Sequence, residues 1–343
     1  MTTIEVQPRT ADEEFAERRR HIGQKIQHFV HRHPWSSPLA ILIVTVMCFS
    51  AISAQFSAAV NLSLVLQQSA VLAAVSAGQV LVLISGGVDL SVGSLMVLTT
   101  LVVGKLSADA GLPDVIALLA GAAAGAALGA FNGSMIARFK LNPFIVTLGS
   151  LSIFGALVTL VSGGESIDAG KFGSLINLTG KSFKIAGFTF TWGIVVVAVL
   201  YLVLSYMLLQ TSWGRHVFAV GDDSEAARLV AIRVSRVRMS VYIAAGVIMA
   251  IAGWVLIGRT AAASPQAATT VNLDSITAVV IGGTSLAGGR GSIIGAVVGS
   301  VLVTVFRNGL FLVGVDALYQ NLAVGVLTIV AVGLDQWIRK VKA

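Results

Sequence analysis

Long apolar runs without a charged residue divide the chain into segments. Ten such runs are present, at 38–58, 64–84, 90–104, 115–137, 141–164, 185–214, 239–258, 275–289, 291–306 and 317–334. A helix that crosses the hydrocarbon core of a bilayer needs about 20 apolar residues, and seven of the runs have 18 residues or more. The other three are short, and short glycine-rich segments often form broken helices in membrane proteins. The pattern predicts an all-α polytopic membrane protein with about ten transmembrane helices, some short or broken, or eight or nine if short runs pair.

The composition agrees with a membrane location. Hydrophobic side chains make up 56% of the 343 residues and charged side chains only 11%, whereas a soluble chain carries about 25% charged residues. The mean hydropathy of +0.88 makes an ordinary soluble enzyme or a disordered chain improbable. Cys48 is the single cysteine, so the chain has no intramolecular disulfide and no cysteine metal cluster.

The basic charges gather at alternate ends of the apolar runs. With the N-terminus in the cytoplasm and ten spans, 17 of the 23 Lys and Arg residues fall on the cytoplasmic side, as expected of an inner (plasma) membrane protein. A pI near 9.9 also suits nucleic-acid binding, but this layout favours a membrane protein with lipid contacts and no nucleic-acid partner. We therefore expect both termini in the cytoplasm and a transmembrane domain at 38–338.

The segments outside the runs are assigned on the same basis. Residues 1–37 are predicted to form a polar cytoplasmic tail, in preference to a lipid or nucleic-acid patch around Arg18–Arg20. Four histidines of this tail lack a defined ligand spacing, so no metal site is predicted. Residues 165–184 form the longest outer loop, which is either a docking surface for an external partner or a solvated connector.

The cytoplasmic loop 211–238 contains a helix signal. Asp222, Asp223 and Ser224 are N-cap residue types directly ahead of the stretch EAARL at 225–229. A short helix near 224–232 is therefore predicted. A helix of this length is marginal by itself, so we expect it to dock onto the membrane domain or a partner; an interfacial helix without a partner is the alternative.

Five stretches together resemble a known family. The EAA stretch at 225–227 resembles the EAA loop of ABC importer permeases. The stretches ISGGVDLSVGS (84–94), NPFIVTLG (142–149), GRHVFAVG (214–221) and GGTSLAGGRGS (282–292) resemble the ribose-type branch, which moves monosaccharides. Their order and spacing agree from about residue 60 to the C-terminus. One departure is Ala231-Ile232-Arg233, where the family usually has Gly-Ile-Asn.

The resemblance implies a non-catalytic permease subunit of an ATP-driven monosaccharide importer. Its implied partners are an ABC ATPase subunit, a periplasmic sugar-binding protein and a second permease subunit, expected as a homodimer. Loop 211–238 would then be the coupling loop, with the ATPase contacted by Asp222, Glu225, Ala226, Ala227, Arg228, Leu229 and Ile232. Independently, the sequence has no G-x-x-x-x-G-K-[ST] phosphate loop. The energy for transport must therefore come from another chain or from an ion gradient. The resemblance implies ATP hydrolysis on a partner ATPase subunit, and no cofactor is predicted for this chain.

Polar residues within or beside the apolar runs are the candidates for a translocation pathway. They are Gln68, Ser76, Gln79, Asp89, Asn142 and Thr284. Gln68, Ser76 and Gln79 share roughly one helix face. Uncharged polar side chains suit a sugar pathway, but they also bond membrane helices together, and the sequence leaves both readings open.

Asp89 is the only acid between residues 38 and 108. We interpret it as the N-cap of a short helix at 90–104, in preference to a direct role in substrate or proton handling. The stretches 86–89 and 282–284 echo each other. This echo indicates either paired broken segments of a transport pathway or glycines that allow close helix contact.

Two other functional classes were weighed. A secondary, ion-coupled transporter of a small polar solute would carry several buried acids or histidines as a relay, whereas Asp89 is nearly alone and all five histidines lie outside the runs. A membrane enzyme would need a nucleophile and base or a set of metal ligands, and no run contains one. The importer permease is therefore the favoured prediction, and the sequence does not identify the sugar.

Overall fold

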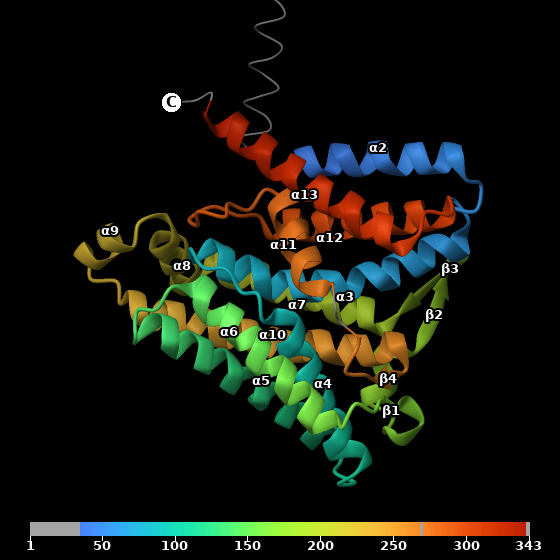
Figure 1. Cartoon of the computed structure of the whole chain (residues 1–343), viewed down its shortest axis with the longest axis horizontal. Coiled ribbons are helices and arrows are strands. Elements are labelled where there is room, and N and C mark those ends of the chain that lie inside the picture. Colours follow the sequence, from blue (N-terminus) through green and yellow to red (C-terminus); the bar gives the residue numbers. More distant parts are fainter. Residues whose placement is uncertain (1–34, 268–269, 341–343) are drawn as a thin grey trace, which may run out of the picture.

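The computed structural model describes residues 35–267 and 270–340, which are predominantly helical (Figure 1). The predicted tail at 1–37 lies almost entirely outside the described residues. The α-helices are α2 (Ser36–Ile52), α3 (Ala59–Ile84), α4 (Val92–Ala108), α5 (Asp114–Ala137), α6 (Pro143–Ser162), α7 (Trp192–Gln210), α8 (Ser212–Asp222), α9 (Ser224–Leu229), α10 (Val234–Thr260), α11 (Val271–Ile281), α12 (Ile293–Leu312) and α13 (Ala317–Lys340).

The little sheet that is present forms two antiparallel pairs. Strand β1 (Ile167–Asp168) pairs with β4 (Ala262–Ala263), and β2 (Ser182–Ile185) pairs with β3 (Phe188–Thr191). Two 3-10 turns, Ala169–Lys171 and Ile176–Gly180, lie between β1 and β2. The segment predicted as the longest outer loop is thus a small folded unit.

Each of the ten predicted runs overlaps one apolar helix, and the run 185–214 also holds β3 and the start of α8. Six helices in the described part are long and apolar enough to cross a membrane, namely α3, α5, α6, α7, α10 and α12, and four shorter apolar helices accompany them. The all-α membrane fold is therefore confirmed, while the number of spans stays a prediction. One expectation was wrong: the run 291–306 is not a short segment, because α12 continues through Arg307 to Leu312.

The bundle has two distinct ends, which Figure 1 places at its left and right. We call them the α9 end, which holds α8, α9 and residues 282–292, and the hairpin end, which holds β2 and β3. Helix α3 spans the distance between them. Its first residues lie beside β3, where Ser63 Oγ accepts a hydrogen bond from Thr189 N–H, and its last residues lie beside α8.

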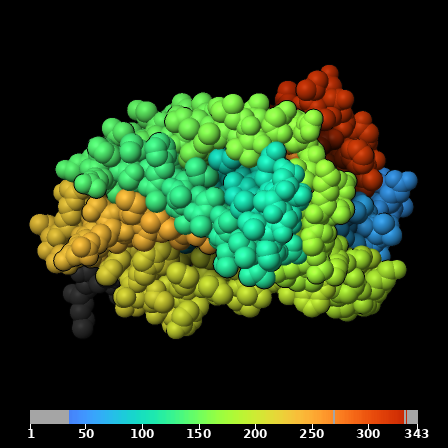
Figure 2. Space-filling model, turned by 90° about the horizontal axis from the view of Figure 1, so that it is seen from below, coloured from blue at the N-terminus to red at the C-terminus, as the bar shows by residue number. Residues whose placement is uncertain are grey.

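Helices α3 and α10 form the centre of the bundle. In the most apolar 18-residue stretch of each helix, the buried share is 83% for α3 and 67% for α10. The same share is only 22–33% for α5, α6 and α7. The outer helices instead expose large apolar side chains such as Leu119, Leu160 and Leu202, as expected of surfaces that face lipid. Figure 2 views the molecule from the side of α5 and α6 (green), with the end of α4 (teal) emerging beside them.

Helices α5 and α10 approach each other backbone to backbone. A Cβ atom added at Gly246 would overlap the carbonyl oxygen of Gly125, and one added at Gly125 would overlap that of Gly246. Small residues allow membrane helices to pack this closely. Any side chain at Gly246 must therefore separate α5 from α10.

We predict that Gly246→Val destabilises the fold, because overpacking a tight contact costs about 1–3 kcal/mol. The matched control is Gly149→Val on α6, where an added Cβ meets no atom within 4 Å; both changes alter helix propensity equally. The measurement is the midpoint of thermal unfolding of the purified protein in detergent. Equal midpoints for the two variants would contradict the close-packing argument.

Candidate functional site

Helix α9 forms in the loop where the sequence predicts it. Asp223 is its N-cap, and the Asp223 carboxylate accepts hydrogen bonds from the backbone N–H groups of Glu225 (2.9 Å) and Ala226 (3.1 Å). Glu225 and Arg228 form an exposed ion pair of 2.7 Å on the helix surface. The helix is shorter than predicted, since it ends at Leu229.

The chain leaves α9 through a left-handed residue. The Ile232 N–H donates to the Ala227 carbonyl, and the Ala231 N–H donates to the Arg228 carbonyl (both 3.0 Å), which is the hydrogen-bond pattern of a Schellman motif. Ala231 has φ of 63°, a conformation that glycine adopts without steric cost. The family resemblance has Gly at this position, so the departure noted in the sequence leaves a strained residue at the end of α9.

The two sides of α9 have different surroundings. Ala227 is buried against the bundle, and Ile232 is half-buried and packs on the same core. Ala226 and Val230 are exposed, and Leu229 has 90% of its surface exposed. The predicted coupling residues therefore divide into an inner pair and an uncovered outer side, to which Asp222, Glu225 and Arg228 also contribute.

The two glycine motifs meet at the end of α8. The Gly289 N–H donates to the Ile84 carbonyl (2.9 Å). A Cβ added at Gly221 would overlap that same carbonyl, and one added at Gly288 would touch both Gly221 and Gly86. We call these five residues the glycine junction. It joins the segments 84–94 and 282–292 directly to the loop that carries α9. The contacts are made by Gly288 and Gly289, whereas the predicted echo paired 86–89 with 282–284.

Asp89 organises the start of α4. Its Oδ1 atom accepts hydrogen bonds from the N–H (2.7 Å) and the hydroxyl (2.6 Å) of Ser91, immediately before α4 begins at Val92. The chain of bonds continues, because Asn132 Nδ2 donates to Ser91 Oγ (3.0 Å) and Ser150 Oγ donates to Asn132 Oδ1. Asp89 thus fixes the entry to α4 and ties it to α5 and α6. The prediction that Asp89 is the N-cap of this helix was wrong, because the N-cap is Ser91 and no described side chain caps α4.

The other predicted pathway residues do not form one cluster. Ser76 accepts a hydrogen bond from Ser300 of α12 (3.0 Å), which is an interhelical contact. Gln79 and Thr284 are buried, and their side chains have no hydrogen-bond partner among the described residues. Gln68 is half-buried, whereas Asn142 is exposed and caps α6 by accepting from the Phe144 N–H (2.9 Å).

A cavity of about 330 Å³ lies between α4, α6 and the segment before α11. Its lining includes Gly93 and Ser94 at the start of α4, Gly155 and Thr159 on α6, and Asn272 in the first turn of α11. The Gly93 N–H donates to Asn272 Oδ1 (2.6 Å), so the starts of both short helices adjoin this cavity. Apart from the resemblance, these residues were not predicted from the sequence to line a cavity. The polar stretch before the short run 275–289 was the one local feature that pointed to them.

A partly buried ion pair links α11 to α12. Arg307 of α12 donates to Asp274 of α11 (2.7 Å) and to Asn321 of α13 (2.8 Å). A hydroxyl contact of 2.7 Å between Thr277 and Thr328 adds a second link from α11 to α13. A charged side chain within an apolar helix costs free energy unless it is paired. The ion pair with Asp274 therefore allows Arg307 to lie inside α12. The predicted run ended at residue 306, so Arg307 was not expected within a helix.

Comparison with known proteins identifies the family. The model of the family described as "Branched-chain amino acid transport system / permease component" matches residues 61–332. The fructose import permease protein FrcC of Rhizobium meliloti is 45% identical over 324 residues, which cover 93% of this chain and 90% of the relative. The ribose import permease protein RbsC of Escherichia coli (strain K12) is 35% identical over 302 residues, covering 87% of this chain and 92% of the relative.

A third relative differs in its sugar. The D-allose transport system permease protein AlsC of Escherichia coli (strain K12) is 32% identical over 301 residues, which cover 88% of this chain and 91% of the relative. No solved structure matches the chain. The expected resemblance to sugar importer permeases is confirmed, and so is a multi-pass location in the inner membrane. The chain belongs to the branched-chain amino acid transport system / permease component family.

Proposed function

We propose that this chain is the permease subunit of an ATP-driven importer and forms the translocation pathway for a monosaccharide. The observation that supports this proposal is the similarity, over nearly the whole chain, to permeases named for fructose, ribose and D-allose. The three sugars differ, so the class of substrate is a monosaccharide. Calorimetry of the cognate binding protein against a panel of sugars would identify which one.

The proposed orientation places the α9 end in the cytoplasm. It rests on the charge count, in which 17 of 23 basic residues share one side. On this proposal the ten apolar helices are embedded, with α4 and α11 as short members, and both termini are cytoplasmic. The hairpin end then faces the periplasm, where the folded unit at 165–191 provides the docking surface for a sugar-binding protein.

We predict that the two ends differ in access to an impermeant thiol reagent. Single cysteines replace Ser174 and Ala226, both exposed, in a Cys48→Ser background because Cys48 is itself exposed. In intact cells with a permeabilised outer membrane, the Ser174 site should react and the Ala226 site should not. The reverse labelling pattern would contradict the orientation.

The cavity beside α4 and α6 is the proposed outer part of the pathway. Its volume of about 330 Å³ falls within the usual range of small-ligand pockets, about 300–1,000 Å³. Hydroxyl and amide groups of Ser94, Thr159, Gln266 and Asn272 contribute to its lining. Such groups both donate and accept hydrogen bonds, as a sugar requires. Gln79 and Thr284, buried without partners, are proposed to meet the sugar deeper in the bundle.

We predict that filling this cavity blocks uptake. Gly155→Phe places a large side chain on the cavity wall, where an added Cβ meets no atom within 4 Å. Gly149→Phe on the same helix is the matched control, since Gly149 is equally free of neighbours but does not line the cavity. Uptake of labelled sugar into proteoliposomes with all subunits should fall at least tenfold for Gly155→Phe and stay normal for Gly149→Phe. A tenfold loss corresponds to a free-energy difference of about 1.4 kcal/mol. Normal uptake by this variant would remove the cavity from the pathway.

Helix α9 is proposed to couple the permease to an ATPase subunit. Its outer side, with Ala226, Leu229 and the rim residues Asp222, Glu225 and Arg228, docks on the ATPase. Ala227 and Ile232 on the inner side rest on the bundle. A displacement of α8 and α9 is passed through the glycine junction to the segments 84–94 and 282–292, because backbone lies directly on backbone there.

We predict that Ala226→Trp abolishes ATPase co-purification and sugar-stimulated ATP hydrolysis. Ala226 is exposed, so the indole leaves the fold intact but prevents close docking. Ala110→Trp is the control, an exposed alanine just after the end of α4. ATP hydrolysis and uptake are measured in proteoliposomes with the complete set of subunits. Normal coupled uptake by Ala226→Trp would favour the ion-driven alternative.

A further inference from the structure

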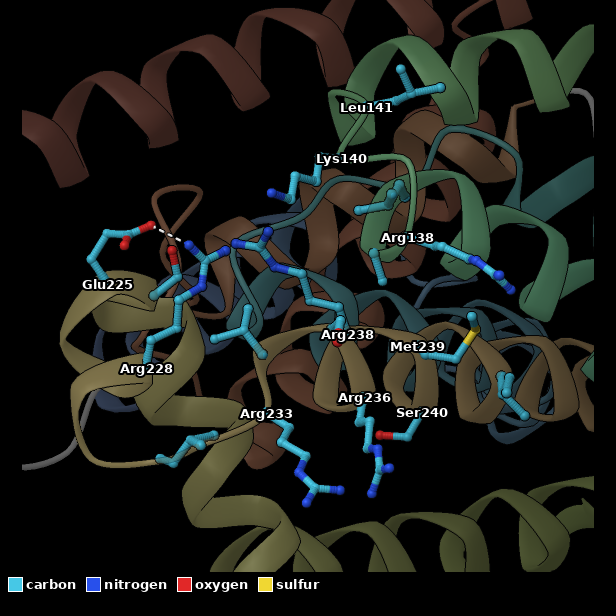
Figure 3. Close-up of a pocket in the computed structure, with 17 residues that line it drawn as sticks. Arg138, Lys140, Leu141, Glu225, Arg228, Arg233, Arg236, Arg238, Met239 and Ser240 are labelled. Carbon is cyan, nitrogen blue, oxygen red and sulfur yellow. Dashed lines mark hydrogen bonds and ion pairs between the residues drawn. The ribbon is translucent and has the colours of Figure 1, made fainter.

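A large cationic cavity lies at the α9 end of the molecule. Its volume is about 1000 Å³, and its walls come from the end of α5, the connection to α6, α9 and the start of α10 (Figure 3). Glu225 is the one acid in its lining. The cations in the lining are Arg138, Lys140, Arg228, Arg233, Arg236 and Arg238.

The charges of this cavity are poorly balanced. Glu225 pairs with Arg228 at 2.7 Å, and no other cation of the lining forms an ion pair with a described residue. Figure 3 shows Lys140 and Arg238 directed toward Arg228, whereas Arg233 and Arg236 point to the opposite side. Three basic side chains from three different elements therefore converge around one region, and an anion there would relieve their repulsion.

Seven residues of the remaining lining are apolar and three are serines. Ile136 and Leu141 come from α5 and its connection to α6, and Ile232, Met239 and Ile243 come from the start of α10 and the chain before it. A ligand that satisfies both parts has an anionic group and hydrocarbon. A free phosphate ester or an acidic protein surface would leave the apolar part uncovered.

The position of the cavity also indicates a lipid. Helices α5, α6 and α10 are membrane-span candidates, and the cavity is built where they begin or end. Beside it, Phe139 and Phe144 expose 60% and 52% of their surfaces, so apolar surface suited to lipid adjoins the cavity. Basic pockets between membrane helices at this depth suit anionic head groups.

We propose that this cavity binds the phosphate head group of an anionic phospholipid, held by Lys140, Arg228 and Arg238, with the acyl chains lying against the apolar wall. The bound head group links α9 to the α5–α6 connection and to α10. The site is also joined to α8, because Trp213 Nε1 donates to Ser240 of the cavity wall (2.8 Å). The lipid therefore stabilises the segment proposed for coupling.

The test uses the full-length protein without any ATPase subunit, so that it is independent of the proposed coupling. Native mass spectrometry measures competition between phosphatidylglycerol and phosphatidylcholine for the detergent-purified protein. We expect a preference for phosphatidylglycerol that falls about fivefold in Lys140→Gln and again in Arg238→Gln, since each basic residue near a membrane surface contributes about 1 kcal/mol. Arg215→Gln is the matched control, an exposed arginine of α8 outside the lining, and should keep the preference.

Three results would overturn the proposal. The first is an unchanged lipid preference in both cavity variants. The second is displacement of phosphatidylglycerol by soluble glycerol 3-phosphate, which would make the site one for a free phosphate ester. The third comes from a separate purification of the two cavity variants with the ATPase subunit: loss of ATPase co-purification with an unchanged lipid preference would assign the cavity to a protein interface. Lys140 is exposed, so Lys140→Gln keeps the test valid if Arg238→Gln fails to fold.

Discussion

The arrangement of this protein depends on one contact between backbones, at the glycine junction. The Ile84 carbonyl accepts the Gly289 N–H and lies so close to Gly221 that no side chain fits there. A flexible side chain at such a contact would absorb a small displacement. Backbone against backbone does not, because interiors packed at this density transmit strain. The end of α3, the segment after α11 and the end of α8 must therefore shift together.

How charge is accommodated explains why two of the helices are short. Helix α4 begins only after Asp89 has been satisfied by Ser91, and α11 begins beside the pair formed by Asp274 and Arg307. Without these contacts, burial of each charge would cost free energy. The hydrogen bonds of Asp89 and the ion pair of Asp274 fix where the short helices start, and both starts adjoin the cavity through Gly93 and Asn272. The polar interior that a hydrophilic substrate needs is thus also the framework that positions α4 and α11.

The sequence predicts the helices well and the contacts between them poorly. Apolar runs locate the ten helices because a bilayer imposes a length on each, and Asp223 locates the start of α9 because capping is local. The cavity at Gly155 and Asn272 joins residues more than 100 positions apart, so no local pattern contains it. The partner of Arg307 was missed for the same reason. Ala227 was expected to contact the ATPase because of the resemblance to the EAA loop, whereas the burial of its side chain against the bundle is a property of tertiary packing.

Helix α9 is held by its surroundings more than by its own stability. A helix of six residues is too short to persist alone, and the left-handed Ala231 at its end adds a cost that glycine would avoid. Its position is therefore set by Ala227 and Ile232 against the core. Repulsion among Arg228, Arg238 and Lys140 acts against those contacts unless an anion lies between them. An element balanced in this way changes position with a small input of binding energy, which suits a segment that must follow a partner without unfolding the bundle beneath it.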